Sequence, residues 1–271
     1  MPRADWEHVA EAPIWLPASA LQDQIAHVDI ALERSGRLLT QAIAAKREQK
    51  RGLMQQLLTG KVRFPGFDEP WRTVAIGELM EERARKVAWD DEKVYRLISI
   101  RRRNGGVFPR EELPGSKILT KSLFSVESGD LLVSCRQVVH GAIAVVPPEL
   151  HGSCVSGEYL CLRERKGAQI DARFVNLIAH LPAMRKLTLN CSYGVHIEKL
   201  NLDVPKFMRS KVLVAPTLAE QVRIVGFFES IEQQLSLLQA QRAALASQRR
   251  GLMDRLLSGD IALPSSDTSA A

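Results

Sequence analysis

A run of three arginines followed by an asparagine and two glycines has residue types suited to nucleic-acid contact. Arg101, Arg102, Arg103 and Asn104 follow an apolar segment that predicts a strand, and the next two glycines predict a turn. Such a loop can bring guanidinium groups to phosphates or to guanine edges, and Asn104 can pair with adenine. The alternative is an ordinary solvated charge run.

Two further polar segments have donors and acceptors that suit base readout. Residues 134–140 lie between two predicted strands, and residues 190–196 form a polar turn after a basic pair. The alternative for both is a plain surface turn. Their joint placement in one basic region supports a DNA-binding surface. We therefore predict DNA contacts from the following residues: Arg101, Arg102, Arg103, Asn104, Lys121, Arg136, Gln137, His140, Arg185, Lys186, Asn190, Ser192, Tyr193 and His196.

The common catalytic motifs are absent from the sequence. It contains no GxxxxGK[ST] phosphate loop, no GxGxxG fingerprint, no GxSxG elbow and no HExxH zinc motif. Asp130 with Glu164 and Lys166 loosely matches a metal-dependent nuclease, which is an alternative to a binding protein. The four cysteines lack CxxC spacing, so they favour neither a disulfide scaffold nor a zinc ribbon. The sequence predicts a non-catalytic protein with no cofactor and no metal.

The charge is concentrated in the middle of the chain. Of 271 residues, 45% are hydrophobic and 25% charged, as in an ordinary globular protein. The sequence has no apolar run of the roughly 18 residues that span a membrane and no secretory signal pattern, so we expect a cytoplasmic protein without a membrane partner. Residues 70–215 contain 23 Lys and Arg against 16 Asp and Glu, which leaves the flanks nearly neutral. This partition favours a DNA-reading part between neutral flanks.

An internal repeat brackets this basic part. Residues 17–65 align without a gap on residues 216–264, and KRGLMQQLLTG at 50–60 matches RRGLMDRLLSG at 249–259 best. Chance would rarely give so many matches in one register. The chain therefore carries two copies of one structural element.

Each copy of the repeat has the pattern of a long helix. Apolar residues recur at alternating steps of three and four, which is the seam of a coiled coil. Gly60 and Gly259 stand where the helices should end. Polar or small residues interrupt the seam at Asp29, Gly36, Lys46, Lys50, Arg242 and Arg249. We expect two long antiparallel helices; the alternative is two ordinary amphipathic core helices.

The region between the repeats predicts a mixed globular domain. Short strand-like runs occur at 94–100, 130–135, 142–147 and 159–163, and residues 171–187 predict a helix interrupted at Pro182. The predicted fold class is α+β, with a mixed globular domain flanked by two long helices that form an antiparallel coiled coil. The expected divisions are an N-terminal extension at 1–16, a first helical region at 17–62, the globular domain at 63–215, a second helical region at 216–260 and a flexible tail at 261–271.

These motifs resemble those of type I restriction–modification specificity subunits. RGLMQQLLTGKVRFPGF and RRGLMDRLLSGDIALP look like that family's helical regions, and residues 215–235 look like its signature, a proline followed by a Leu-x-Glu-Gln element. Residues 129–163 and 192–205 are similar to the core and the closing segment of its target-recognition domain. The resemblance implies that residues 63–215 form such a domain.

The same resemblance implies a set of partners. Family members usually carry two recognition domains, each reading one half of a split DNA site, with helices that set the gap. With a single recognition domain, this chain is similar to a half-length subunit or to the later half of a split gene, and residues 1–16 to a remnant of the other domain. The implied partners are double-stranded DNA, type I methyltransferase (modification) subunits, restriction subunits, and a second reader, which is either a homodimer partner or another specificity half.

A stand-alone coiled-coil DNA-binding regulator without restriction partners is the alternative function. Its affinity for DNA would depend mainly on salt and would be indifferent to sequence. Comparing random with selected duplexes at a fixed salt concentration separates the two functions.

Overall fold

The computed structural model describes residues 7, 10–11 and 16–261. Within them the chain forms two compact units. Residues 50–229 form the globular unit, and the described residues up to 49 and from 230 onward form the helical unit. The expected N-terminal extension and C-terminal tail lie for the most part outside the described residues.

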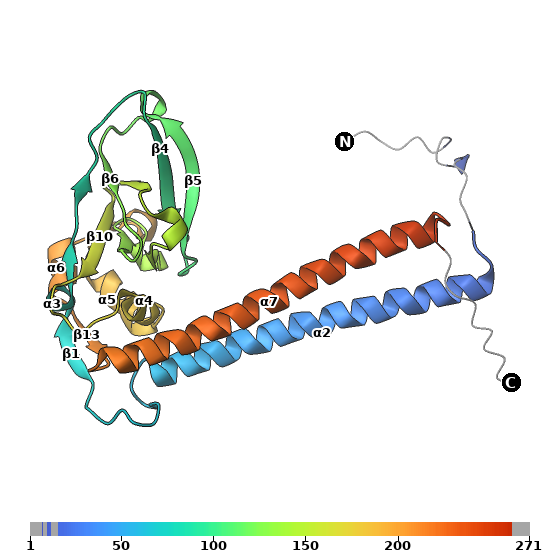
Figure 1. The fold of residues 1–271 in the computed structure, drawn as a ribbon, viewed down its shortest axis with the longest axis horizontal. Coiled ribbons are helices and arrows are strands. Elements are labelled where there is room, and N and C mark those ends of the chain that lie inside the picture. Colours follow the sequence, from blue (N-terminus) through green and yellow to red (C-terminus); the bar gives the residue numbers. More distant parts are fainter. Residues whose placement is uncertain (1–6, 8–9, 12–15, 262–271) are drawn as a thin grey trace. The chain divides into compact units, whose positions relative to one another are not determined.

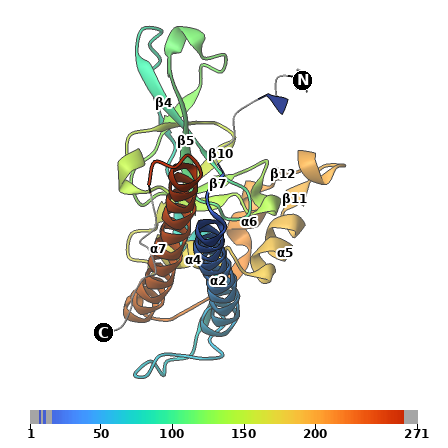
Figure 2. The same cartoon turned by 90° about the vertical axis from the view of Figure 1, so that its right-hand side faces the viewer.

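Two helices of nearly equal length contain both copies of the repeat. Helix α2 spans Ser19–Leu57 and helix α7 spans Leu218–Leu257. In the helical unit they lie side by side and run in opposite directions (Figures 1 and 2). Their seam buries Ile25 and Ile43 of α2 with Ile231 and Leu235 of α7. The prediction of two long antiparallel helices is therefore confirmed.

Two of the polar residues that interrupt the seams, one from each helix, form an ion pair. Arg249 of α7 donates from Nε and Nη2 to the two carboxylate oxygens of Asp29 of α2, at 2.7 and 2.8 Å. This contact lowers the pKa of the Asp29 carboxyl below its ordinary value. Gly36 and Arg242 line one groove of the helical unit. The Asp29–Arg249 pair thus joins one interruption of each seam, which is consistent with a single register of the two helices.

The globular unit contains two larger sheets. The five-stranded sheet has the order β3-β6-β9-β4-β5, and the four-stranded sheet has the order β2-β10-β7-β8. Strand β4 pairs antiparallel with β5 and parallel with β9, and all other pairs are antiparallel. The strands are β2 (Met80–Glu82), β3 (Arg85–Lys86), β4 (Val94–Ile100), β5 (Val107–Pro114), β6 (Leu123–Ser125), β7 (Leu131–Ser134), β8 (Ile143–Val145), β9 (Cys154–Ser156) and β10 (Tyr159–Glu164).

Shorter elements complete the globular unit. Helix α4 packs on β7 and β8, while β1 pairs with β13 and β11 pairs with β12. The remaining elements are β1 (Arg72–Ala75), α3 (Ile76–Leu79), α4 (Ala172–Ile178), α5 (Pro182–Asn190), β11 (Ser192–Tyr193), β12 (Asn201–Leu202), α6 (Val204–Arg209) and β13 (Lys211–Val214). The predicted break at Pro182 is confirmed, because this proline begins α5.

A core between the sheets explains why these segments form strands. Ile98 and Ile100 of β4 pack with Leu132 of β7, Ala144 of β8 and Val155 of β9 in one buried cluster. Strand β7 is buried at all of its positions, which matches its continuous apolar run. The four strands predicted from apolar runs correspond to β4, β7, β8 and β10.

The start of α7 is fixed to the loops of the globular unit by two buried polar side chains. Glu220 accepts hydrogen bonds from Arg63 Nε and Nη2 at 2.8 and 2.9 Å, and from Trp71 Nε1 at 3.2 Å. Gln221 donates to two backbone carbonyls and accepts from one backbone N–H, at 2.8–3.0 Å. Their exposed fractions are 1% and 0%. The Glu-Gln pair of the signature segment therefore has a structural role.

Candidate nucleic-acid interface

Three of the polar loops of the globular unit meet around one cavity. Its volume is about 600 Å³, and it is lined by residues 102–104 after β4, by 138–141 between β7 and β8, and by residues of α5 with the loop before it. Arg102, Arg103, Asn104, His140 and Arg185, all predicted from the sequence, line it. The structure therefore brings together parts of the first two predicted segments and Arg185, one member of the basic pair that precedes the third.

Backbone hydrogen bonds lock the first loop to the second. Arg103 and Asn104 have φ values of +58° and +54°, a left-handed conformation that costs non-glycine residues free energy. The Arg103 N–H donates to the His140 carbonyl at 2.7 Å, and the Asn104 N–H donates to the Gly141 carbonyl at 2.8 Å. A Cβ on Gly141 would lie 3.0 Å from Asn104 Oδ1. The close approach of the two loops therefore depends on this glycine.

Unpaired polar atoms are buried at this junction. Asn104 Oδ1, Gln137 Oε1 and His140 Nε2 are inaccessible to solvent and have no hydrogen-bond partner. A buried polar atom left unpaired costs roughly 1–3 kcal/mol. His140 Nε2 lies 3.5 Å from Glu198 Oε1, which is an ion pair only when the imidazole is protonated. Asn104 and His140, which carry two of these atoms, line the cavity beside the guanidiniums.

Four further predicted residues are not among those that line the cavity: Arg101, Lys121, Arg136 and Gln137. Arg101 lies over the Phe108 ring, 4.4 Å from its centroid. Arg136 forms an ion pair with Glu158. Lys121 donates to Asp91 at 3.1 Å, in a different part of the globular unit.

The third predicted segment has more regular structure than a turn. Lys186 and Asn190 belong to α5, and Asn190 is its last residue rather than a turn residue. Ser192 and Tyr193 form β11; Ser192 Oγ donates to the Thr188 carbonyl at 2.7 Å. The Tyr193 hydroxyl accepts from Asn201 Nδ2 at 3.0 Å, and its side chain is exposed. Exposed His196 lies in the loop joining β11 to β12.

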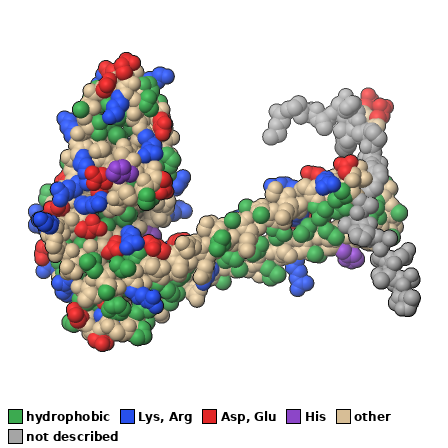
Figure 3. Space-filling model, in the orientation of Figure 1, with side chains coloured by type: hydrophobic (Ala, Val, Ile, Leu, Met, Phe, Trp, Pro, Cys, Tyr) green, Lys and Arg blue, Asp and Glu red, His purple; other side chains and the backbone are tan. Residues whose placement is uncertain are grey.

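One charged residue of this cavity, Glu198, belongs to no sequence motif. Glu198 lies in the loop between β11 and β12 and lines the cavity. Its Oε2 accepts a hydrogen bond from Arg102 Nη2 at 2.8 Å. A single acidic residue in a polar loop carries no motif, and the contact joins positions far apart in the chain. Lys and Arg side chains are scattered over the globular unit on the face that Figure 3 shows.

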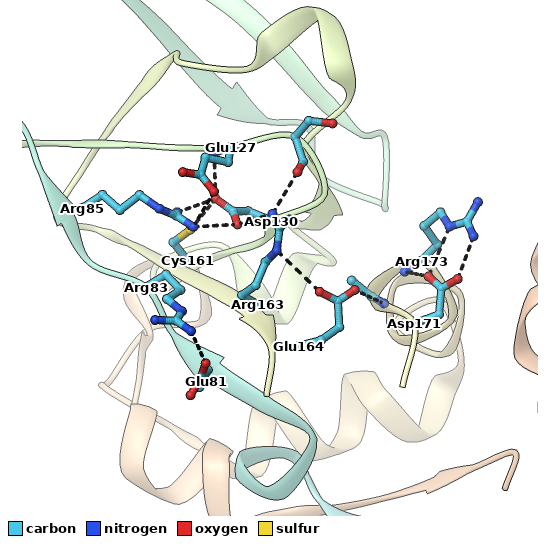
Figure 4. A network of polar contacts seen from close by, with 12 residues as sticks. Glu81, Arg83, Arg85, Glu127, Asp130, Cys161, Arg163, Glu164, Asp171 and Arg173 are labelled. Carbon is cyan, nitrogen blue, oxygen red and sulfur yellow. Dashed lines mark hydrogen bonds and ion pairs between the residues drawn. The ribbon is translucent and has the colours of Figure 1, made fainter. Parts of the chain in front are cut away.

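Asp130, a candidate in the nuclease alternative, is instead the centre of a buried ion-pair network (Figure 4). Its carboxylate accepts from Arg85 at 2.7 and 3.3 Å, from Arg163 at 3.0 Å and from the Glu127 N–H at 2.8 Å. Cys161 donates its thiol hydrogen to the same carboxylate at 3.2 Å. Protein donors therefore surround both oxygens of Asp130.

The pKa values in this network reflect burial opposed by hydrogen bonding. Burial raises the pKa of Asp130, but hydrogen bonds from the Glu127 N–H, Arg85, Cys161 and Arg163 outweigh it, so the pKa is lowered overall. Burial, with the adjacent Asp130 charge, raises the pKa of the Cys161 thiol to about 12.

Glu164, the second carboxylate of the nuclease alternative, is also occupied by protein donors. It accepts from the Ala172 N–H at 3.0 Å and lies 3.6 Å from Arg163 Nε. Among the described residues, no three His, Cys, Asp or Glu side chains are grouped so that they could hold a metal ion. The contacts of both carboxylates indicate a structural role. No helix in the described part of the chain has the length and hydropathy needed to cross a membrane.

Solved structures with a similar fold come from type I restriction–modification systems. The HsdS subunit from Thermoanaerobacter tengcongensis aligns with a TM-score of 0.54 at 20% identity, over 96% of this chain and 64% of that one. The S subunit of the M. genitalium system aligns with a TM-score of 0.55 at 13% identity, over 88% and 61%.

A third similar chain comes from solved work on the structural basis of complex assembly and conformational transition of the type I R-M system. It aligns with a TM-score of 0.53 at 22% identity, over 91% of this chain and 61% of that one. This chain thus spans between 61% and 64% of the length of the three structures. No family model matches the sequence, and no curated protein matches it. The predicted α+β fold with paired long helices is confirmed, and it is the fold of type I specificity subunits.

Proposed function

We propose that this chain is the specificity subunit of a type I restriction–modification complex and reads one half of a bipartite DNA site. The observation that carries the proposal is the cavity at which three loops meet. It combines three guanidinium groups, from Arg102, Arg103 and Arg185, with the unpaired buried atoms of Asn104 and His140. Guanidiniums bind phosphates or guanine, and an amide side chain discriminates adenine. The likeness in fold to specificity subunits supports this assignment.

A non-catalytic role accompanies this proposal. The carboxylates of Asp130 and Glu164, the strongest candidates for catalysis in the sequence, are held by arginines and backbone N–H groups. Base modification and strand cleavage would then belong to methyltransferase and restriction subunits that dock on the helices.

Equivalent exposed leucines support docking on the helical unit. Leu38 of α2 and Leu237 of α7 occupy matching positions of the repeat, and their exposed fractions are 57% and 65%. Both stand beside the buried seam rather than in it. Apolar side chains repeated on the outside of a coiled coil suit two equivalent partner contacts.

A difference in burial between the repeats supports a second reader. Leu58 at the end of the first copy is 1% exposed in the globular unit, whereas its counterpart Leu257 is 59% exposed. Gln221 is buried, whereas its counterpart Gln22 is exposed and donates to the Pro17 carbonyl at 2.7 Å. The start of α2 and the end of α7 thus expose residues whose counterparts in the other copy of the repeat are buried in the globular unit. A second copy of the chain, or another specificity half, would cover them.

Selection of bound duplexes from a random library tests DNA reading by the full chain. We expect enrichment of a short motif at physiological salt, because base contacts add to the salt-dependent phosphate contacts. Binding without any enriched motif would refute sequence reading and favour the stand-alone regulator.

Co-purification with candidate type I methyltransferase chains tests docking. The methylated site is then mapped, and we expect it to contain the enriched motif. Methylation of the same site after removal of this chain would refute the docking role.

A further inference from the structure

We infer that Glu198 is an internal competitor for DNA at the reading cavity and thereby weakens DNA binding there. The inference rests on the proposed function. In the free protein, the Glu198 carboxylate binds the Arg102 guanidinium at 2.8 Å. A carboxylate and a phosphate present the same kind of anionic acceptor to a guanidinium. Glu198 therefore occupies the position on Arg102 that a DNA phosphate, or the acceptor edge of guanine, would take.

A separate hairpin, formed by β11 and β12, positions Glu198 beside the loop that carries Arg102. Strands β11 and β12 pair at Ser192 with Leu202 and at Tyr193 with Asn201, and they form the base of a hairpin. In the hairpin loop, Gly194 has a φ of +136°, and a Cβ there would lie 3.2 Å from both the Lys199 carbonyl and Leu200 Cδ2. This close packing brings Glu198 to Arg102, which precedes it by 96 residues.

The same carboxylate also faces His140. Its Oε1 lies 3.5 Å from His140 Nε2, while its Oε2 binds Arg102. One side chain thus covers a cation and an unpaired buried nitrogen of the reading cavity. When DNA replaces Glu198, both groups become available together.

The ion pair is weak enough for DNA to displace. The Arg102 and Glu198 side chains are 50% and 58% exposed, and exposed pairs contribute little to stability. A random duplex offers few contacts that compensate for breaking the pair. A matching duplex also satisfies Asn104 and His140. The competition therefore lowers the affinity for any duplex that has to displace Glu198, by at most the strength of this exposed ion pair.

Binding of the full-length chain to random-sequence duplex tests this inference without knowledge of the target. The variant is Glu198→Gln, and the matched control is Glu111→Gln. Glu111 is in another exposed ion pair, with Arg110 at 3.4 Å, and does not line the cavity. Both changes add the same net charge. We expect Glu198→Gln to bind random duplex about two- to five-fold more tightly than the control variant, as the strength of an exposed ion pair implies.

The salt dependence gives a second readout. If Arg102 gains one phosphate contact on random duplex, the slope of log K against log salt becomes steeper by about 0.9 in Glu198→Gln and not in the control. Glu198→Asp keeps the charge but withdraws the carboxylate, and should behave like Glu198→Gln. Adding Arg102→Gln to Glu198→Gln should abolish the gain. Thermal unfolding of each variant shows that it is folded.

Equal affinities and slopes for Glu198→Gln and Glu111→Gln would overturn the inference. Weaker binding by Glu198→Gln would also overturn it and would indicate that Glu198 itself contacts a base, such as the cytosine amino group. Failure of the proposed function is distinguishable, because wild-type protein would then enrich no motif from the random library whatever Glu198 does.

Discussion

At the scale of single residues, Asn104 combines a left-handed backbone with a buried, unpaired side-chain oxygen. Substitution by alanine would remove the amide and also strain the backbone. Asn104→Gly removes the amide and keeps the φ of +54° at no steric cost. We expect this variant to lose about 1–3 kcal/mol of discrimination at one base position and to keep its affinity for random duplex. Selection from a randomised library measures the effect, and an unchanged motif would remove Asn104 from the site.

Asp130 gives a prediction about stability at the same scale. Asp130→Asn leaves Arg85 and Arg163 without their shared buried carboxylate. We expect the free energy of unfolding, measured in urea, to fall by about 3 kcal/mol, because removing one partner from a buried pair leaves the other charge uncompensated. Glu127→Gln is the matched control, since Glu127 pairs with the same Arg85 at 3.0 Å but is 46% exposed. The control should lose no more than about 1 kcal/mol; equal losses would contradict the network.

The lowered pKa of Asp130 predicts how stability depends on pH. A carboxyl whose pKa is lower in the folded state stabilises the protein fully above its unfolded pKa, which is about 3.9. That stabilisation is lost as the pH falls from there through the folded pKa. Urea midpoints of wild type and Asp130→Asn, measured between about pH 6 and pH 2, should converge on acidification. A constant difference over this range would show that the Asp130 charge does not stabilise the fold.

Sequence patterns indicated several polar residues that line the cavity, but they did not indicate which of these residues contact one another. The arginine loop and the loop before β8 were recognisable because glycines and flanking strands are local signals. Glu198 was not recognisable, since it meets Arg102 only through the β11–β12 hairpin. Lys121 does not line the cavity, and its neighbours Asp91 and Trp89 lie about 30 residues away in the sequence. Pairing of distant loops leaves no short-range pattern.

At the scale of elements, the long helices and the apolar strands followed from periodicity. Strands β6 and β9 are only three residues long, and β5 contains Pro109 and Pro114 with a run of charged residues. Such segments form strands because neighbouring strands pair with them, β4 with β5 and β9, and β9 with β6, and not because of their own composition. The sequence also did not show the register of α2 on α7. Asp29 and Arg249 each interrupt the apolar pattern of their own helix, and only the paired helices show that they contact each other.

Two glycines, one within α2 and one in the turn that follows it, give opposite predictions for stability. Gly36 lies within α2, and a Cβ there would have nothing within 4 Å. Gly36→Ala should therefore stabilise the protein by about 1 kcal/mol, through higher helix propensity. Gly60 has a φ of +70°, and its Cβ would lie 3.1 Å from Trp71, so Gly60→Ala should destabilise it by at least about 1 kcal/mol. Urea denaturation compares them; destabilisation by Gly36→Ala would show that the open space beside this glycine is needed.

At the scale of the whole molecule, the proposed function makes the helices a spacer between two half-sites. Residues 30–36 of α2 and 242–248 of α7 are one heptad each, and Asp29 and Arg249, which pair, border them. Deleting both segments keeps this ion pair and the phase of both seams. It shortens the coiled coil by about 10 Å, which equals about three base pairs.

We expect the doubly deleted chain, purified with its methyltransferase partner, to modify a site with unchanged half-sites and a gap about three base pairs shorter. The half-sites stay the same because the reading cavity lies in the globular unit, which the deletions do not touch. Deleting five residues instead of seven from each helix is the control, since about 1.4 turns rotate the apolar seam to nearly the opposite face, and this should abolish modification. Mapping of methylated positions measures both. An unchanged gap in the heptad variant would show that the helices do not determine the separation of the half-sites.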